Sequence, residues 1–261
     1  MRTIRFLLIL LSAFAFSGLP AIAGDDIGVV LLHGKRGTAM PNSPIGKLKS
    51  FLENKGIFVV APDMPWSRSR GFDKTHKASM AEIDEAVADL KSDGAKKIVV
   101  GGHSIGANAA LAYGARRGGL AGILAIAPGH IIDIESFQEN IGFDYKRARA
   151  MIAAGKGDDE AKFKDYNQGK ASTFFSTAAI YQSWFDPEGP ANMPVNTKNL
   201  KPGTPLMWIV GEDDNIADRG EGYAYSSAPE HPNNAYVVIG GGHRATPSKG
   251  KKKILKWLKG L

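Results

Sequence analysis

Hydrophobic and polar residues follow two different periods along the chain, and these periods predict strands and helices in turn. Six short apolar runs have the length of buried strands: 27–32, 57–61, 97–101, 121–127, 205–210 and 235–239. Apolar residues at helical spacing predict helices at 44–54, 80–90, 105–117 and 249–258. Ser79 and Glu82 have the spacing of a capping box at the start of the second helix. Continuous apolar strands that alternate with helices predict an α/β fold with a mostly parallel central sheet and helices on both faces.

The alternation stops at 129–201, ahead of the penultimate strand. This segment is polar, basic and aromatic, and it is expected to form helices and an irregular stretch at 186–199. An insertion of this length between two core strands is typical of a lid or of a wall of a substrate pocket. The alternative is a structural extension of the core.

The first 23 residues have the pattern of a bacterial secretory signal peptide. Arg2 and Arg5 precede the apolar stretch 6–16, and Ala21-Ile22-Ala23 offers small residues at the positions needed for cleavage. The apolar stretch is shorter than the roughly 20 residues that a membrane-spanning helix needs. We therefore expect one mature domain at 24–261, located in the periplasm or secreted. An uncleaved anchor or a buried helix is the alternative.

The composition of the chain excludes several classes of ligand and catalytic group. The formal net charge of +7 is too small an excess to indicate nucleic-acid binding. The chain has no cysteine, which excludes disulfide bonds, thiolate metal ligands and a cysteine nucleophile. His and Asp do not occur at metal-site spacing, and the G-x-x-x-x-G-K-[ST] phosphate loop is absent. We therefore expect neither a metal nor a cofactor.

Ser104 is the candidate nucleophile, in the pentapeptide Gly102-His103-Ser104-Ile105-Gly106. The pentapeptide follows a predicted strand and precedes a predicted helix. In this context a sharp turn exposes the serine hydroxyl at the top of a sheet. Glycines are expected on both sides because a side chain there would clash with nearby backbone. The alternative is a glycine-rich turn with an incidental serine.

A serine nucleophile needs a histidine base that a carboxylate orients. His243 follows the last predicted strand, after three glycines. Asp214 follows the strand before it and is the preferred acid. Glu212 and Asp213 are its neighbours in the same loop, and Asp133 follows the strand at 121–127, so these three remain alternatives.

The loop after the first predicted strand supplies a candidate oxyanion hole. His33-Gly34 allows the backbone to turn, so that the N–H of Lys35 can point into the site beside the N–H of Ile105. Two such donors would stabilise a developing oxyanion by roughly 3–4 kcal/mol each.

Residues near the same strand ends are candidates for substrate binding: His33, Gly34, Trp66 and His130. With Lys35, Arg36, Arg68 and Arg70 they could form a positive rim that attracts an anionic or carboxylate-bearing substrate. The alternative is an ordinary solvated surface.

The His-Gly loop, the elbow, the acid loop and the final Gly-Gly-His occur in an order that resembles the α/β-hydrolase superfamily, in particular its esterase- and lipase-like members. The resemblance covers nearly the whole expected mature chain. It implies an α/β-hydrolase fold and an exported serine hydrolase, in which Ser104, His243 and Asp214 cleave a carboxylic ester or related acyl bond. Thioesterases, amidases and acyltransferases use the same triad. A non-catalytic binding protein on this fold is the alternative.

The expected partner is therefore a small acyl compound and not a nucleic acid. The basic, amphipathic segment at 249–259 is expected to cover the core with its lysines outward. Its alternative role is a weak contact with an anionic membrane surface. The oligomeric state stays open.

Overall fold

A computed structural model describes residues 26–261 of the chain, so the predicted signal peptide lies outside the described residues. Six strands form one sheet in the order β2-β1-β3-β4-β7-β8, and every neighbouring pair is parallel. The strands are β1 (Ile27–Leu32), β2 (Phe58–Val60), β3 (Lys97–Ser104), β4 (Gly122–Pro128), β7 (Leu206–Gly211) and β8 (Ala235–Ile239). The predicted α/β architecture is confirmed.

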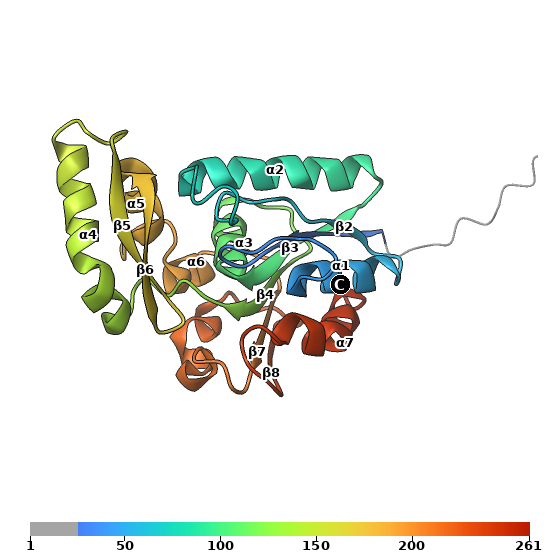
Figure 1. Ribbon diagram of the computed structural model, residues 1–261. Coiled ribbons are helices and arrows are strands. Elements are labelled where there is room, and N and C mark those ends of the chain that lie inside the picture. The colour runs from blue at the N-terminus through green and yellow to red at the C-terminus, as the bar shows by residue number, and fades with distance from the viewer. Residues whose placement is uncertain (1–25) are drawn as a thin grey trace, which may run out of the picture.

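Helices cover both faces of this sheet (Figure 1). They are α1 (Pro44–Glu53), α2 (His76–Ser92), α3 (Ile105–Arg116) and α7 (Thr246–Leu258). Successive residues of β1 point to opposite faces, as the strand period requires. Val30 and Leu32 belong to the core under α2 and α3, whereas Val29 and Leu31 belong to the core under α1 and α7. The continuous apolar runs of the sequence are thus explained by burial on two sides.

Helix α2 begins earlier than the sequence indicates, and the capping box predicted at Ser79 and Glu82 is wrong. Thr75 caps the helix, since its hydroxyl accepts a hydrogen bond from the Ala78 N–H at 3.3 Å. The Ser79 hydroxyl donates to the Thr75 carbonyl at 3.0 Å, inside the helix. Glu82 instead forms an ion pair with Arg70 at 2.7 Å. The Glu82 carboxylate, which the local pattern assigns to the N-terminus of the helix, is therefore engaged by a residue from a preceding loop.

Residues 129–201, the cap from here on, form a layer to one side of the sheet (Figure 1). The cap contains α4 (Glu135–Ala153), β5 (Glu160–Asn167), β6 (Lys170–Thr177), α5 (Ala178–Phe185) and α6 (Met193–Lys198). The antiparallel β5–β6 hairpin is absent from the sequence prediction, as is α6 inside the stretch expected to be irregular. Gln168 and Gly169 both have positive φ, 50° and 74°, as the favoured two-residue hairpin turns need.

Aromatic side chains form the interior of the cap and fix it to the sheet. Tyr181 stacks on Phe163 and on Phe185, with ring centroids 4.3 Å apart in both pairs. Trp184 meets Trp66, from the loop after β2, edge to face at 5.4 Å. These five side chains are fully buried. The aromatic residues that mark the insertion in the sequence are thus its core.

A buried ion pair also connects the cap to the sheet. The Lys35 ammonium, from the loop after β1, lies 2.6 Å from the Asp165 carboxylate on β5, and the two side chains are only 2% and 7% exposed. The ammonium also lies 3.3 Å from His130 Nδ1 and 5.4 Å from the ring centroid of Phe185. Desolvated charges of this kind are stable only while both partners are present.

Helix α7 packs one face on the sheet. Ile254 and Leu258 are buried, and Trp257 Nε1 donates to the Asn233 carbonyl at 2.7 Å. Across residues 26–261, no helix combines the length and the hydropathy needed to cross a membrane.

We expect Asp165→Asn to lower the free energy of unfolding by about 3–5 kcal/mol, because it leaves the Lys35 ammonium buried without a counter-charge. The double variant Lys35→Met, Asp165→Leu should recover most of this loss. Denaturant unfolding of the double variant and of its two component single variants, Lys35→Met and Asp165→Leu, measures the coupling energy between the two side chains. The exposed pair Lys49–Glu53 is the control, and Glu53→Gln should cost less than about 1 kcal/mol. Additive effects at Lys35 and Asp165 would contradict the account.

Candidate active site

Ser104 lies at a sharp turn between β3 and α3, in a backbone conformation that residues other than glycine rarely adopt. Its φ and ψ are 60° and −123°. A Cβ placed on Gly102 would lie 2.7 Å from the Leu32 carbonyl oxygen, and one on Gly106 would lie 2.5 Å from the same atom. The turn therefore exists because both flanking residues lack a side chain. Strain of this kind costs about 1–3 kcal/mol and persists only where the surrounding structure enforces it.

Gly129, the first residue after β4, lies against both the candidate nucleophile and the candidate base. A Cβ on Gly129 would lie 2.7 Å from Ser104 Oγ and 3.5 Å from His243 Cε1. The serine hydroxyl and the imidazole ring thus border the same glycine. Sequence reasoning missed Gly129, although a Pro-Gly pair directly after a core strand was an available signal.

His243 forms its hydrogen bond with Asp214. The Nδ1 atom lies 2.7 Å from Asp214 Oδ2, and the Asp214 carboxylate is 3% exposed. A carboxylate accepts, so Nδ1 carries the proton and Nε2 is left to act as a base. Of the alternative acids, Glu212 and Asp213 are exposed, and Asp133 accepts the Tyr223 hydroxyl at 2.7 Å. The structure therefore brings together Asp214 and His243.

His103 holds the loop that carries His243. Its Nε2–H donates to the His243 carbonyl at 2.9 Å, and the two ring centroids are 4.7 Å apart. Burial lowers the pKa of His103 to about 4, with the nearby His243 as a second cause. His103 is therefore neutral near pH 7. Its single ring proton is on Nε2, where it is donated to the His243 carbonyl. The sequence analysis gives this residue no role beyond its place in the pentapeptide.

His33 and Trp66 order the loop after β1. His33 Nε2 accepts the Met64 N–H at 3.0 Å, and Nδ1–H donates to the Gly34 carbonyl at 2.9 Å. Trp66 Nε1 donates to the His33 carbonyl at 2.7 Å. Burial lowers the pKa of His33, and its neutral Nε2 is an acceptor, so its 3.6 Å approach to Asp63 is not an ion pair. Both side chains are buried and set the course of the loop.

This loop approaches Ser104 at Gly34. A Cβ on Gly34 would lie 3.0 Å from His103 Nδ1 and 3.3 Å from Ser104 Cβ. The next backbone N–H, that of Lys35, donates to no acceptor in residues 26–261. Ile105 is the first residue of α3, where helical N–H groups have no acceptor within the helix. Two backbone amides are thus available beside Ser104.

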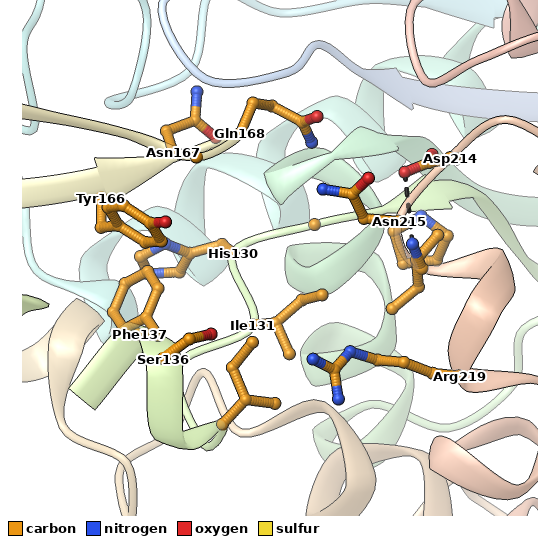
Figure 2. A pocket seen from close by; sticks show the side chains of 15 residues that line it. His130, Ile131, Ser136, Phe137, Tyr166, Asn167, Gln168, Asp214, Asn215 and Arg219 are labelled. Atoms are coloured by element: carbon orange, nitrogen blue, oxygen red, sulfur yellow. Dashed lines mark hydrogen bonds between the residues drawn. The ribbon is translucent and has the colours of Figure 1, made fainter. Parts of the chain in front are cut away.

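A pocket of about 170 Å³ opens beside these groups (Figure 2). Its lining includes Gly129 and Asp214 together with Ile131, Phe137 and Tyr166. Of the predicted substrate-binding residues, His130 lines this pocket, whereas Trp66 lines a smaller cavity of about 90 Å³ beside Lys35.

His130 is neutral in this pocket. Its Nε2–H donates to the Trp184 carbonyl at 2.8 Å, and its Nδ1 faces the Lys35 ammonium. Burial and the Lys35 charge hold the pKa of His130 well below its usual range.

The positive rim expected from the sequence is largely neutralised. Lys35 is paired with Asp165, and Arg70 is paired with Glu82 at 2.7 Å and with Asp73 at 2.9 Å. Exposed guanidinium groups remain at Arg36 and Arg68, beside the smaller cavity. In the part of the chain that the structure describes, no three His, Asp or Glu side chains gather as a metal site would require.

Comparisons with known proteins identify the family of the chain. The model of the alpha/beta hydrolase family matches residues 29–249, and the chain belongs to this family. A search of curated protein sequences found no match.

Solved structures share the fold at low sequence identity. A monoacylglycerol lipase from Paleococcus ferrophilus has a TM-score of 0.64 at 20% identity, over 89% of this chain and 94% of that one. A putative hydrolase from Agrobacterium vitis S4 has a TM-score of 0.62 at 18% identity, over 90% of each chain. A thioesterase domain from the curacin biosynthetic pathway has a TM-score of 0.55 at 17% identity, over 89% of this chain and 90% of that one.

We expect Gly129→Ala to lower kcat/KM for p-nitrophenyl acetate by about 100-fold, because the new methyl group would displace Ser104 Oγ. Thermal unfolding should change little by comparison. Gly142→Ala is the control, since a Cβ there meets nothing within 4 Å. Equal activity in the two variants would show that Gly129 does not border a functioning nucleophile.

Proposed function

We propose that the protein is a serine hydrolase that cleaves a carboxylic ester or a related acyl bond through a covalent intermediate on Ser104. The observation that carries the proposal is the 2.7 Å bond between His243 and Asp214, with the imidazole and Ser104 Oγ bordering the same glycine. Family membership supports hydrolysis as the reaction class.

The proposed reaction begins when Ser104 Oγ attacks the carbonyl carbon of the substrate and His243 Nε2 takes its proton. Asp214 orients the imidazole and stabilises the imidazolium that forms. The oxyanion of the tetrahedral intermediate accepts hydrogen bonds from the N–H groups of Lys35 and Ile105. His243 then donates its proton to the leaving group, and the acyl group stays on Ser104.

Water completes the cycle. His243 removes a proton from a water molecule as the water attacks the acyl-enzyme carbonyl carbon. The second tetrahedral intermediate collapses, Ser104 Oγ leaves and regains its proton from His243, and the carboxylic acid departs. Each chemical step therefore uses the same base and the same two amide donors.

The names of two structural neighbours bear on the bond that is cleaved. One is a monoacylglycerol lipase and another a thioesterase domain, so this fold is used for oxygen esters and for thioesters. We propose an ester as the substrate of this chain, with a thioester, an amide or acyl transfer as variants of the same chemistry.

Covalent labelling by a fluorophosphonate probe tests the proposal. We expect wild-type protein to be labelled and Ser104→Ala to be unlabelled, because the probe reacts with an activated serine hydroxyl. His243→Ala should react at least about 1000-fold more slowly, since the base is lost. His231→Ala is the matched control: the imidazole Nδ1 of His231 accepts the Asn233 N–H at 3.1 Å, and removal of this ring should leave the labelling rate unchanged.

Two results would overturn the proposal. One is folded wild-type protein that does not react, and the other is a Ser104→Ala variant that reacts as fast as wild type. Either result would favour a binding protein built on this fold.

A further inference from the structure

Arg219 lies at the edge of the pocket that adjoins the proposed triad. It ends a short 3-10 helix, Ala217–Arg219, in the same loop as Asp214. Its side chain extends across the pocket toward Ile131 and Ser136 (Figure 2). The sequence analysis did not single out this residue, because nothing local distinguishes it from other surface arginines.

The charge of Arg219 is not balanced by the protein. No carboxylate in residues 26–261 lies within ion-pair distance of its guanidinium, whereas Arg70 has two such partners and Arg117 and Arg147 have one each. Asp214 is engaged with His243, and Asp133 accepts the Tyr223 hydroxyl.

A tyrosine ring supports the guanidinium. The group lies 5.8 Å from the ring centroid of Tyr223, and the hydrogen bond to Asp133 holds that ring in place. Arg219 is therefore held on an aromatic ring with its donors available to a ligand.

The remaining lining of the pocket carries no second cation. Ile131 and Phe137 are apolar, Tyr166 and Asn167 are neutral, and His130 is kept unprotonated by burial and by Lys35. The carboxylate of the lining, Asp214, is hydrogen-bonded to His243 at 2.7 Å. A substrate in this pocket would therefore meet one positive charge that has no partner, and otherwise apolar or neutral groups apart from that engaged carboxylate. Such a pocket selects a substrate that has one anionic group.

We propose that Arg219 is a specificity-determining residue that binds a carboxylate on the substrate, so that the preferred substrates are esters with a free carboxylate in the part that fills this pocket. This inference rests on the proposed function, which puts the scissile carbonyl at Ser104. A planar guanidinium matches a carboxylate through two parallel hydrogen bonds. A phosphate monoester carries about two negative charges near pH 7 and would leave one unbalanced, which favours the carboxylate.

The test compares p-nitrophenyl hemiesters of glutaric, adipic and pimelic acid with the corresponding esters of their monoamides. Each monoamide has the shape of its acid and no charge. We expect wild-type kcat/KM to favour the acid by about tenfold for at least one chain length, through a lower KM. The preference should fall at high salt, because the guanidinium is partly exposed to solvent.

Arg219→Gln should abolish this preference and leave kcat/KM for the monoamide esters within about twofold of wild type. Arg219→Lys should retain part of the preference, since the charge stays and the bidentate geometry is lost. The matched control is Arg149→Gln. Arg149 is also an exposed arginine over a tyrosine, 5.7 Å from the Tyr145 centroid, but it does not line the pocket. This control should keep the full preference.

The inference fails if wild type shows no preference at any chain length, or if Arg219→Gln and Arg149→Gln change the preference equally. In both cases, hydrolysis of the monoamide esters that depends on Ser104 would leave the proposed function intact. Absence of hydrolysis of every ester, together with absence of fluorophosphonate labelling, would overturn the proposed function and this inference with it.

Discussion

The tight contact between the end of β1 and the turn at Ser104 is the constraint on which the rest of the site depends. The Leu32 carbonyl oxygen occupies the space that a side chain at Gly102 or Gly106 would need. The backbone at the end of β1 therefore packs directly on the backbone of the turn, and this contact holds the turn in its strained conformation. The loop that follows β1 brings Gly34 against Ser104 Cβ, and Lys35 is the next residue of that loop. The candidate nucleophile and the loop that carries one candidate oxyanion donor thus depend on a single packing arrangement.

The parallel sheet brings the other groups to this point. Strands β3, β4, β7 and β8 are consecutive neighbours in the sheet. Ser104 is the last residue of β3, and the loops after β4, β7 and β8 carry Gly129, Asp214 and His243 respectively. Each side chain of the proposed triad therefore comes from a different loop on a rigid scaffold, as ligand and catalytic sites of open α/β sheets do. The cap contributes further residues to the lining of the pocket, among them Phe137 and Tyr166. Its ion pair between Asp165 and Lys35 fastens β5 to the loop that carries the candidate oxyanion donor.

The sequence predicts those features that depend on local pattern. Apolar runs locate the six core strands, and the polar residues that directly follow strand ends identify Ser104, Asp214 and His243 as candidates. Features that depend on distant contacts are not predictable in this way. The β5–β6 hairpin packs Phe163 and Phe174 on Tyr181 and Phe185 of a later helix, contacts that its own sequence does not reveal. Glu82 does not form the predicted capping box, because its carboxylate pairs with Arg70 from the preceding loop.

The same limit applies inside the site. The roles of Gly129 and His103 follow from approaches to Ser104 Oγ and to the His243 carbonyl, which neither residue's neighbours in sequence indicate. Arg149, like Arg219, has no carboxylate partner within the described residues, and Arg219 differs from it in lining the pocket beside Asp214. This is a property of its surroundings and not of its sequence context.

The most direct measurement is a crystal structure of the protein after reaction with an alkyl fluorophosphonate. The account predicts a phosphorus atom bonded to Ser104 Oγ, with the phosphonyl oxygen within about 3.2 Å of the backbone nitrogens of both Lys35 and Ile105. An adduct on another residue, or a phosphonyl oxygen that points to solvent away from both amides, would contradict it.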